Sequence, residues 1–451
     1  MTEQANYQLA FVLPDSRKAL GLASPRGAEF PVISIPLWDR PVQRLTERIH
    51  ARWRIRTIVL DILASSTAEI PCAVIEVQCR RWDFERAGFS VLPKAGTSIP
   101  SLSDSQRETL AAILSEDDSD REPLARIGWV QRAQQWIQES VTDQRMEFSE
   151  YVFHVNGCAP FALVRFETRK GSNYWLKATG WPNTHELSVT RMLTERFPSF
   201  LPSLVATRQD WNAWVTEDAG PTLRDSPTLP MIERVVASLA SLQKQSTSQI
   251  GSLSASGCFD CTIPELEAHV DELVDYLDEA MQLQTSTRVE RLDGQQLNKL
   301  RSLLHNACCR MRELDIPDSL VLGDINPGNI LFDGTSSLFI DWAEASIGNP
   351  FVNFEYLVNH IRQLNQQDRD WAPLLRESFK QQWLDMLTES KIDDAFTLAP
   401  VLAIATCLHG RGAWLRSARR NEASFLAFAR SLARRIYHTA LSPGCKEALC
   451  R

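Results

Sequence analysis

The sequence predicts an α+β protein with more than one domain. Short apolar runs typical of strands dominate the first half of the chain, whereas the chain is largely helical from about residue 227 onward. A chain of 451 residues is also too long for a single compact core, so two or three domains are expected.

The composition is that of an ordinary globular protein, with 44% apolar and 23% charged residues. A net charge of −8 argues against a general binder of nucleic acid or acidic membranes. The N-terminus has no basic start followed by an apolar stretch, and the longest apolar run, residues 398–408, is too short to cross a bilayer. We therefore expect a cytoplasmic protein that binds neither nucleic acid nor membrane; the sequence leaves the oligomeric state open.

The ten cysteines do not form a recognisable metal motif. Cys258 and Cys261 make a single CxxC, and a second pair at a usual zinc-site spacing is missing. We expect ordinary reduced thiols, partly buried.

Residues 1–120 are predicted to form a small α+β domain. Helical spacing of apolar residues predicts a helix over residues 42–53, and Ser103 is a plausible N-cap for a second helix over residues 103–114. The polar, acidic segment 116–122 predicts a loop or linker. Strand-like runs occupy residues 8–13, 30–37, 56–63 and 71–79.

This order of strands and helices loosely resembles a Nudix fold. The catalytic Nudix signature is missing, because the helix over residues 40–55 carries only Glu47 where several glutamates would be needed to bind magnesium. The resemblance implies a non-catalytic recognition or regulatory module.

Residues 121–145 are predicted to be a linker helix, and residues 146–220 a second, strand-rich region. The runs 161–168 and 172–178, separated by Arg169, Lys170 and Gly171, predict a β-hairpin. A short helix is expected over residues 185–197, and one or two strands over residues 206–218.

The candidate catalytic and metal-binding residues lie in the stretch LGDINPGNILFDGTSSLFIDW, residues 322–342. Two short strands flank an Asp-Gly turn, and residues equally distant from the turn face each other in an antiparallel hairpin. With the turn centred on residue 335, Asn329 and Asp341 should be opposite each other, and Asp324 can reach the same place. Two carboxylates and an amide oxygen suit a hard cation such as Mg²⁺ with substrate phosphates.

The pattern GD-x-x-x-x-N, a hairpin and then Asp-Trp resembles the catalytic segment of the aminoglycoside phosphotransferase-like kinases, distant relatives of the protein kinases. The resemblance implies a protein-kinase-like bilobal fold over residues 150–440, with a small antiparallel-sheet lobe (residues 146–220) and a mainly helical lobe (residues 221–451), preceded by the N-terminal domain. It implies that Asp324 accepts the proton of a substrate hydroxyl and that Asn329 and Asp341 hold Mg²⁺ on ATP.

The upstream residues match the same family in the expected order. The resemblance assigns nucleotide binding to Lys177, on a strand, and to Glu186, which would pair with it from a helix. The segment 214–220, with Glu217, resembles the hinge that contacts adenine, and Gly157 is the single glycine in the turn that would cover the phosphates.

Two positions depart from the family pattern. Leu322 stands where the family usually has His, and Asn353 stands where many members have an Asp that braces the catalytic loop. Misplaced catalytic groups cost rate, so these changes favour a slow or repurposed enzyme.

Three functions fit these residues. The first is an ATP- and Mg²⁺-dependent kinase that phosphorylates a hydroxyl of a small molecule. The second is a kinase acting on Ser or Thr of a peptide that the N-terminal domain delivers. The third is a pseudokinase that binds nucleotide as a regulatory module.

Overall fold

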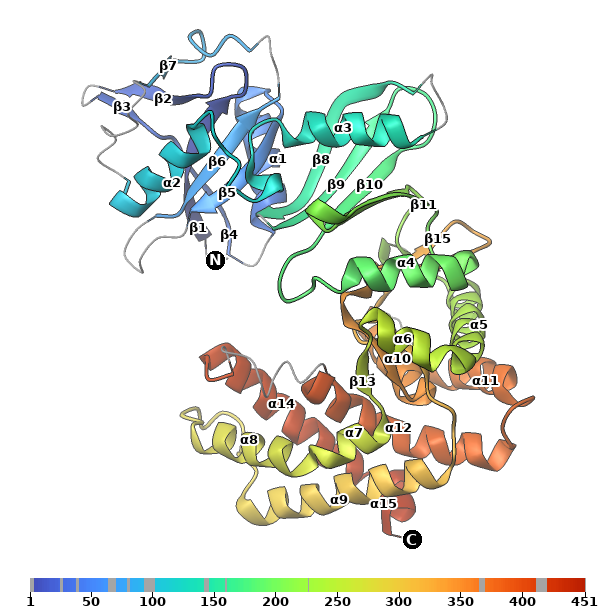
Figure 1. The fold of residues 1–451 in the computed structure, drawn as a ribbon. Coiled ribbons are helices and arrows are strands. Elements are labelled where there is room, and N and C mark those ends of the chain that lie inside the picture. The colour runs from blue at the N-terminus through green and yellow to red at the C-terminus, as the bar shows by residue number, and fades with distance from the viewer. Residues whose placement is uncertain are drawn as a thin grey trace. The chain divides into compact units, whose positions relative to one another are not determined.

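The computed structural model describes residues 4–24, 27–37, 40–63, 70–78, 82–92, 102–141, 146–158, 160–225, 227–364, 370–410 and 420–450. The chain divides into two compact units. The first comprises residues 1–187 and 203–218, and the second comprises residues 188–202 and 219–451. Figure 1 shows the elements of each unit.

The first unit begins with a seven-stranded mixed sheet. Its central path runs β3-β2-β1-β6-β5, β4 pairs with β1, and β7 pairs with β2. β1 is parallel to β6 and antiparallel to its other partners. The strands are β1 (Gln4–Leu13), β2 (Lys18–Ser24), β3 (Gly27–Glu29), β4 (Val32–Pro36), β5 (Thr57–Leu63), β6 (Cys72–Val77) and β7 (Phe89–Val91).

Both helices expected in this region are present. α1 (Pro41–Trp53) buries Val42, Leu45 and Ile49, the helical stripe seen in the sequence. α2 (Asp104–Leu114) begins with a capping box in which Ser103 and Gln106 bond reciprocally, so Ser103 is its N-cap as predicted. The sequence prediction missed β2, β3 and β7, which are short or rich in small residues.

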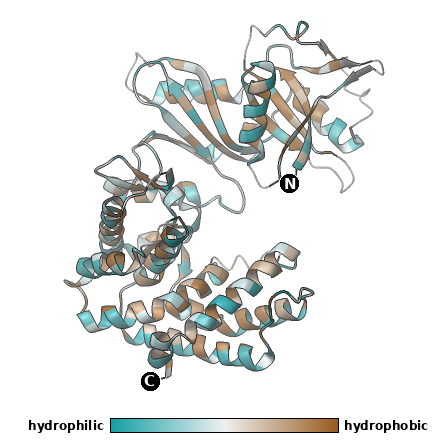
Figure 2. Ribbon diagram, turned by 180° about the vertical axis from the view of Figure 1, so that it is seen from behind, coloured by the Kyte–Doolittle hydropathy of each residue, from teal (hydrophilic) through white to brown (hydrophobic). Residues whose placement is uncertain are grey.

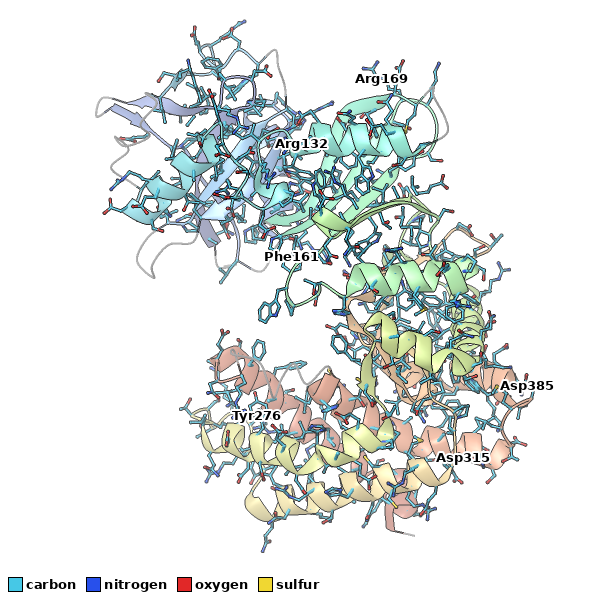
Figure 3. The ribbon with its side chains drawn as sticks, viewed as in Figure 1. Arg132, Phe161, Arg169, Tyr276, Asp315 and Asp385 are labelled. Atoms are coloured by element: carbon cyan, nitrogen blue, oxygen red, sulfur yellow. The ribbon has the colours of Figure 1, made fainter. Side chains whose placement is uncertain are left out.

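A second, five-stranded antiparallel sheet follows, in the order β11-β12-β10-β9-β8. The predicted hairpin is its β9–β10 pair, closed by Gly171 at φ +100°, a conformation that favours glycine. Phe161, labelled in Figure 3, begins β9. The strands are β8 (Phe148–Cys158), β9 (Phe161–Thr168), β10 (Tyr174–Ala178), β11 (Leu204–Arg208) and β12 (Ala213–Glu217).

The two sheets of the first unit share a hydrophobic core with α3 (Trp129–Ser140). Val74 of the first sheet, Trp129 of α3 and Val164 of the second sheet all belong to it. Buried and partly exposed residues alternate along β9 and β10 of the second sheet, as expected when one face of a sheet is buried, whereas β6 of the first sheet is buried throughout; Figure 2 colours the strands by hydropathy. The segment that was predicted to be a linker helix is thus part of a core; the domain boundaries at residues 120 and 145 stay predictions.

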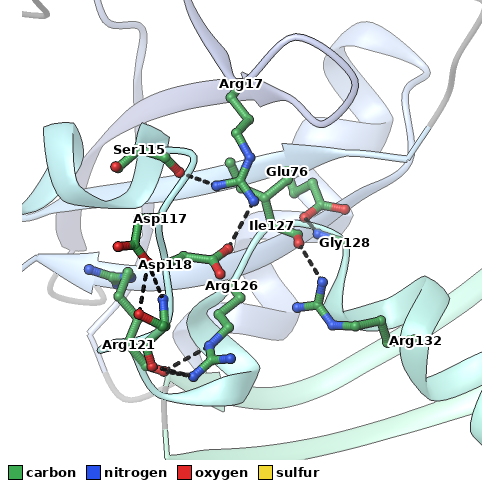
Figure 4. Close-up of polar contacts among 11 residues, drawn as sticks. Arg17, Glu76, Ser115, Asp117, Asp118, Arg121, Arg126, Ile127, Gly128 and Arg132 are labelled. Atoms are coloured by element: carbon green, nitrogen blue, oxygen red, sulfur yellow. Dashed lines mark hydrogen bonds and ion pairs between the residues drawn. The ribbon is translucent and has the colours of Figure 1, made fainter.

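Polar contacts fix the loop between α2 and α3 (Figure 4). Arg17 pairs with Asp118 at 2.9 Å and donates to the carbonyl oxygen of Ser115. Glu76 is fully buried and accepts the backbone N–H of Gly128 at 2.7 Å, at the N-terminus of α3. The acidic loop 116–122 is therefore attached to the first sheet, and the α3 N-terminus has a carboxylate as its partner.

The second unit is mainly helical, as predicted. α4 (Glu186–Arg196) leads into it from the first unit. Tyr276 of α8 donates to the carbonyl oxygen of Arg420 at 3.0 Å, and Lys244 of α5 pairs with Asp385 at 2.7 Å; Figure 3 labels Tyr276 and Asp385. The helices are α5 (Leu229–Ser246), α6 (Ile250–Ser256), α7 (Ile263–Ala268), α8 (Val270–Gln282), α9 (Gly294–Glu313), α10 (Pro350–Leu364), α11 (Ala372–Trp383), α12 (Glu389–His409), α14 (Ala423–Ala440) and α15 (Pro443–Cys450).

Two small sheets interrupt these helices. β15 (Ile330–Phe332) and β16 (Ser337–Phe339) form the predicted hairpin. A three-stranded sheet in the order β13-β17-β14 was not predicted as a sheet. It joins β13 (Phe259–Cys261), β14 (Ser319–Leu322) and β17 (Ala345–Gly348), which are far apart in sequence. The α+β class, with an antiparallel-sheet part and a mainly helical part, is confirmed.

One helix of the described residues, α12, has the length and hydropathy that a membrane span needs. Of its most apolar stretch, 61% is buried inside the protein. α12 contributes Ala399, Leu402 and Ala405 to the main core of the second unit, which accounts for its apolar composition.

Candidate active site

The loop that carries Asp324 begins at a glycine that has no room for a side chain. Gly323 follows β14, and its N–H donates to the carbonyl oxygen of Glu344 at 2.9 Å. A Cβ atom at Gly323 would lie 2.8 Å from that same carbonyl oxygen. The close approach of the two backbones therefore requires glycine at position 323, and this contact holds the backbone in place directly before Asp324.

Asn329 bonds directly to Asp324. Its side-chain Nδ2 donates to the Asp324 carbonyl oxygen at 2.9 Å and to the carboxylate Oδ2 at 3.2 Å. Asn326 also donates to the Asp324 carbonyl, at 3.1 Å, while its Oδ1 accepts the N–H of Gly328 at 2.9 Å. The structure thus brings Asp324 and Asn329 together, and it leaves the Oδ1 atom of Asn329 as the side-chain acceptor that can face a cation.

The hairpin register differs by one residue from the sequence prediction. Ile330 pairs with Phe339, and Ile340 donates to the carbonyl oxygen of Asn329 at 3.0 Å. Asn329 is therefore opposite Ile340, and the predicted pairing with Asp341 is wrong. The reason is the turn: Asp333 accepts the N–H groups of Thr335 and Ser336, which closes a four-residue loop centred between residues 334 and 335.

Asp341 is exposed and follows the hairpin directly. Its backbone has φ 66° and ψ 70°, in the left-handed region that residues other than glycine rarely adopt. The next residue, Trp342, is buried at 2% exposure and holds the chain there. Four other non-glycine residues in the described part of the chain also have a positive φ, so what distinguishes Asp341 is its place directly after the hairpin.

Asn353 braces the loop despite its departure from the family pattern. Its Nδ2 donates to the carbonyl oxygen of Leu322 at 2.8 Å, and its Oδ1 accepts from Gln243 at 3.2 Å. A carboxylate at this position would accept a hydrogen bond, whereas the amide donates one. Leu322 is itself buried, at 3% exposure, among apolar core residues.

A cavity of about 120 Å³ lies beside this loop, within the second unit. Its lining includes Gly323, Glu344, Asn353, Tyr356 and Cys407. Burial is the main cause that raises the pKa of Tyr356, and the charges of Asp324 and Glu344 add to it. Burial, with the charge of Glu344, raises the pKa of Cys407 to about 11. The negative charges of two carboxylates therefore reach the cavity, and the phenol of Tyr356 and the thiol of Cys407 stay protonated at neutral pH.

In the first unit, Lys177 and Glu186 form an ion pair. Lys177 lies on β10 opposite Trp214 of β12, and its Nζ is 2.5 Å from Oε1 of Glu186. The Glu186 side chain is 1% exposed and that of Lys177 22%. The Lys177 ammonium also lies 5.7 Å from the centre of the Trp214 ring, within cation–π range. The predicted pairing of a strand lysine with a helix glutamate is therefore present.

The other two predicted nucleotide-binding residues lie at strand ends. Glu217 ends β12, and its N–H donates to the carbonyl oxygen of Ser203 at 3.0 Å, so this donor is used within the fold. Gly157 lies near the end of β8 and packs on the ring of His154, which leaves no space for a Cβ atom. The nucleotide contacts of Glu217 and Gly157 stay predictions.

Residues 410–435 carry seven arginines, of which Arg416, Arg420 and Arg434 are candidates to face an anionic substrate. Arg416 lies outside the described residues. Arg420 is 3.7 Å from Glu279, and Arg434 donates to the carbonyl oxygen of Glu290 at 2.8 Å. Both therefore have partners within the helical unit.

Sequence comparison gives the class of this site. Residues 212–391 match the sequence model of the phosphotransferase enzyme family. The matched segment contains the Asp324 loop, the β15–β16 hairpin and Asp341. The resemblance predicted from the sequence is thereby confirmed for this segment, and the class of enzyme it indicates is a phosphotransferase. No curated protein matches the sequence.

Solved structures with a similar fold include a choline/ethanolamine kinase family protein from Mesorhizobium loti, with 13% identity and a TM-score of 0.46 over 71% of this chain and 98% of that one. A wild-type aminoglycoside 2'-phosphotransferase-IIIa has 14% identity and a TM-score of 0.46 over 69% of this chain and 99% of that one. An ethanolamine kinase from Plasmodium vivax has 13% identity and a TM-score of 0.45, covering 69% of this chain and 88% of that one. At these TM-scores the likenesses do not decide what the chain acts on.

The sequence analysis missed Glu344, Tyr356 and His154. Glu344 follows Asp341 by three residues and could have been noticed as a third carboxylate beside the hairpin. Tyr356 carries no local signal, because only the packing of distant segments places it at the cavity. His154 lies only three residues before Gly157 on β8, so this contact was within reach of the sequence.

Proposed function

We propose that the protein is a kinase that uses ATP and Mg²⁺ to phosphorylate a hydroxyl group of a small molecule. The observation that carries this proposal is the contact of Asn329 with both the carbonyl and the carboxylate of Asp324, in a segment that matches the phosphotransferase family. The spacing of these two residues is that of a catalytic loop in which one residue serves as base and the other as metal ligand.

In the proposed reaction, the acceptor hydroxyl oxygen attacks the γ-phosphorus of ATP. A new P–O bond forms, the bond to the β-phosphate oxygen breaks, and ADP leaves. Asp324 accepts the hydroxyl proton. The bonds from Asn326 and Asn329 to the Asp324 backbone hold this residue in place, and positioning is the main demand of phosphoryl transfer.

The residues fit a magnesium ion. The amide nitrogen of Asn329 is bonded to Asp324, so its oxygen is available, and the exposed Asp341 adds a carboxylate. Oxygen donors of this kind suit a hard cation that also keeps phosphate oxygens as ligands. Such an ion would neutralise charge on the transferred phosphate. In the first unit, Lys177, paired with Glu186, is the candidate for binding nucleotide phosphates.

The acceptor would enter the cavity lined by Gly323, the residue immediately before Asp324, and by Glu344. A volume of about 120 Å³ favours a small molecule over a peptide as the acceptor. The bond from Asn353 to Leu322 supports an active enzyme over a pseudokinase, since the catalytic loop is braced even without the usual carboxylate. A cytoplasmic location, where ATP is supplied, is part of the proposal.

The first test is a thermal-shift titration of the full chain with ATP, with and without Mg²⁺. A ligand that binds only the folded state raises the melting temperature, and the Mg²⁺-dependent part of the shift should vanish in Asp341→Asn. Asp333→Asn is a matched control, because Asp333 is an exposed turn residue of the same hairpin whose acceptor role an amide oxygen can take. No shift with ATP or GTP in the presence of Mg²⁺ would overturn the proposal.

A further inference from the structure

Three metal-ligating side chains meet at the ends of two helices in the second unit, outside the site described above. Glu265 lies in α7, His269 follows its last residue, and His409 is the last residue of α12. One potential ligand atom from each lies within 4.8 Å of the others. The two imidazole rings are 5.0 Å apart between centroids and tilted by 37°. Residues 140 positions apart in sequence, from 269 to 409, are thus brought to one place.

The hydrogen bonding of His269 prepares it to bind a metal. Its Nδ1 is 2.9 Å from the backbone carbonyl oxygen of Glu265, and a carbonyl can only accept a hydrogen bond. In the neutral ring Nδ1 therefore carries the proton and Nε2 carries the lone pair. A backbone carbonyl on the second ring nitrogen is the usual way in which proteins orient a metal-binding histidine.

The burial of the three groups is graded. His409 is 3% exposed, whereas the side chains of His269 and Glu265 are 23% and 35% exposed. The cluster is therefore anchored in the core on one side and open on the other. The Glu265 carboxylate lies 3.5 Å from Nδ1 of His269. To bind the same ion as Nε2, the partly exposed Glu265 side chain rotates while His269 stays in place, which brings its oxygen to the distance of about 2.0–2.2 Å of a zinc ligand.

We propose that Glu265, His269 and His409 form a binding site for a divalent transition metal, with Zn²⁺ as the best match. Two imidazole nitrogens and one carboxylate oxygen are a donor set that zinc accepts with one position left for water. Imidazole is a poor ligand for Mg²⁺, so this site differs in kind from the oxygen site at Asn329 and Asp341.

The site would fasten α7 to the end of α12. Both elements border the cavity beside Asp324, because Cys261 just before α7 and Thr406, Cys407 and Gly410 at the end of α12 line it. A bound ion would therefore fix one wall of this cavity. The metal site does not depend on the proposed kinase activity, since its ligands are separate from Asp324 and Asp341.

The test is titration of the metal-free full chain with Co²⁺, followed by visible absorption. Four-coordinate cobalt absorbs strongly in the visible range, while six-coordinate cobalt on oxygen ligands absorbs weakly, and thiolate ligands add a near-ultraviolet charge-transfer band. We expect one strongly absorbing Co²⁺ per chain, without the thiolate band, displaced by Zn²⁺. Affinity should fall by roughly tenfold or more in His409→Ala, His269→Ala and Glu265→Gln.

Two controls separate this site from others. His305→Ala removes an exposed histidine that bonds Asp271, and Asp341→Asn removes the proposed magnesium ligand; both should leave the cobalt spectrum unchanged. His409 is buried, and its replacement could prevent folding. The decisive variant is therefore His269→Ala, because His269 is partly exposed. An unchanged spectrum in a folded His269→Ala protein, a spectrum with thiolate bands, or no visible absorption at all would overturn the proposal.

Discussion

The side-chain amide of Asn353 donates a 2.8 Å hydrogen bond to the backbone carbonyl of Leu322, two residues before Asp324. This contact links α10 to the end of β14, and both residues are buried. In the family pattern a carboxylate braces the loop from this position. In this chain Asn353 still supports the loop, but its side chain donates the hydrogen bond where a carboxylate would accept one.

Asn353 should therefore matter for both stability and rate. In Asn353→Ala, the carbonyl of Leu322 keeps the N–H of Ile325 but loses its side-chain donor, and the buried Gln243 loses its acceptor; together these losses should cost about 1–3 kcal/mol of unfolding free energy. Turnover should fall by roughly 10- to 100-fold through misplacement of Asp324, while the apparent KM for ATP changes little. Asn359→Ala, on the same helix, is the control. Wild-type turnover in folded Asn353→Ala would show that the contact does not position the loop.

The Lys177–Glu186 pair should control nucleotide affinity. Lys177→Met removes the charge from β10 and should weaken ATP binding by roughly 10- to 100-fold, since hydrogen bonds to charged groups contribute about 1.5–3 kcal/mol. Calorimetric titration with ATP and Mg²⁺ measures the change. Lys170→Met in the exposed β9–β10 turn should bind ATP normally. Equal affinities for the two variants would remove Lys177 from the nucleotide site.

Gly323 should not tolerate even the smallest side chain. In Gly323→Ala the new Cβ would lie 2.8 Å from the carbonyl oxygen of Glu344, so one of the two backbones must move. Overpacking of this kind costs about 1–3 kcal/mol, which urea unfolding can measure, and turnover should fall with it. Gly251→Ala places a methyl group in open space and should keep both stability and turnover. A fully stable Gly323→Ala protein would contradict the close approach.

His154 should make the protein less stable in acid. Burial lowers the pKa of His154 to about 4, below the ordinary value of 6.5. The unfolded chain then binds more protons between pH 6.5 and pH 4, so stability falls as the pH drops through this window. The shift of the His154 pKa from 6.5 to about 4 corresponds to about 3 kcal/mol of unfolding free energy, because one pKa unit equals about 1.36 kcal/mol.

The measurement is the free energy of urea unfolding between pH 4 and pH 7 for the wild type and for His154→Phe. The slope that His154 contributes should disappear in the variant. His438→Phe, which replaces an exposed histidine, serves as the control. An identical pH dependence in the wild type and His154→Phe would show that this ring does not titrate as its burial predicts.

Much of the site could be predicted because its contacts are local. Asn329 bonds Asp324 across five residues, so spacing was enough to indicate that pair. Glu186 pairs with Lys177 across nine residues, and the resemblance to the kinase family indicated this second pair. The hairpin register could not be set by counting from the Asp-Gly pair. Its turn is closed by the Asp333 side chain, and this shifts the pairing by one residue.

The sequence by itself determined the α+β class and the hairpin that follows Asp324, because strand patterning, helix periodicity and turn chemistry act over a few neighbouring residues. The resemblance to the kinase family supplied the strand lysine with its helix glutamate. Only the tertiary structure decided which segments meet. Asn353 reaches Leu322, and the backbone of Glu344 leaves room only for glycine at position 323. His409 meets His269 in the same way. These contacts depend on how a helix, a strand end and a distant loop pack together, and no local pattern records that packing.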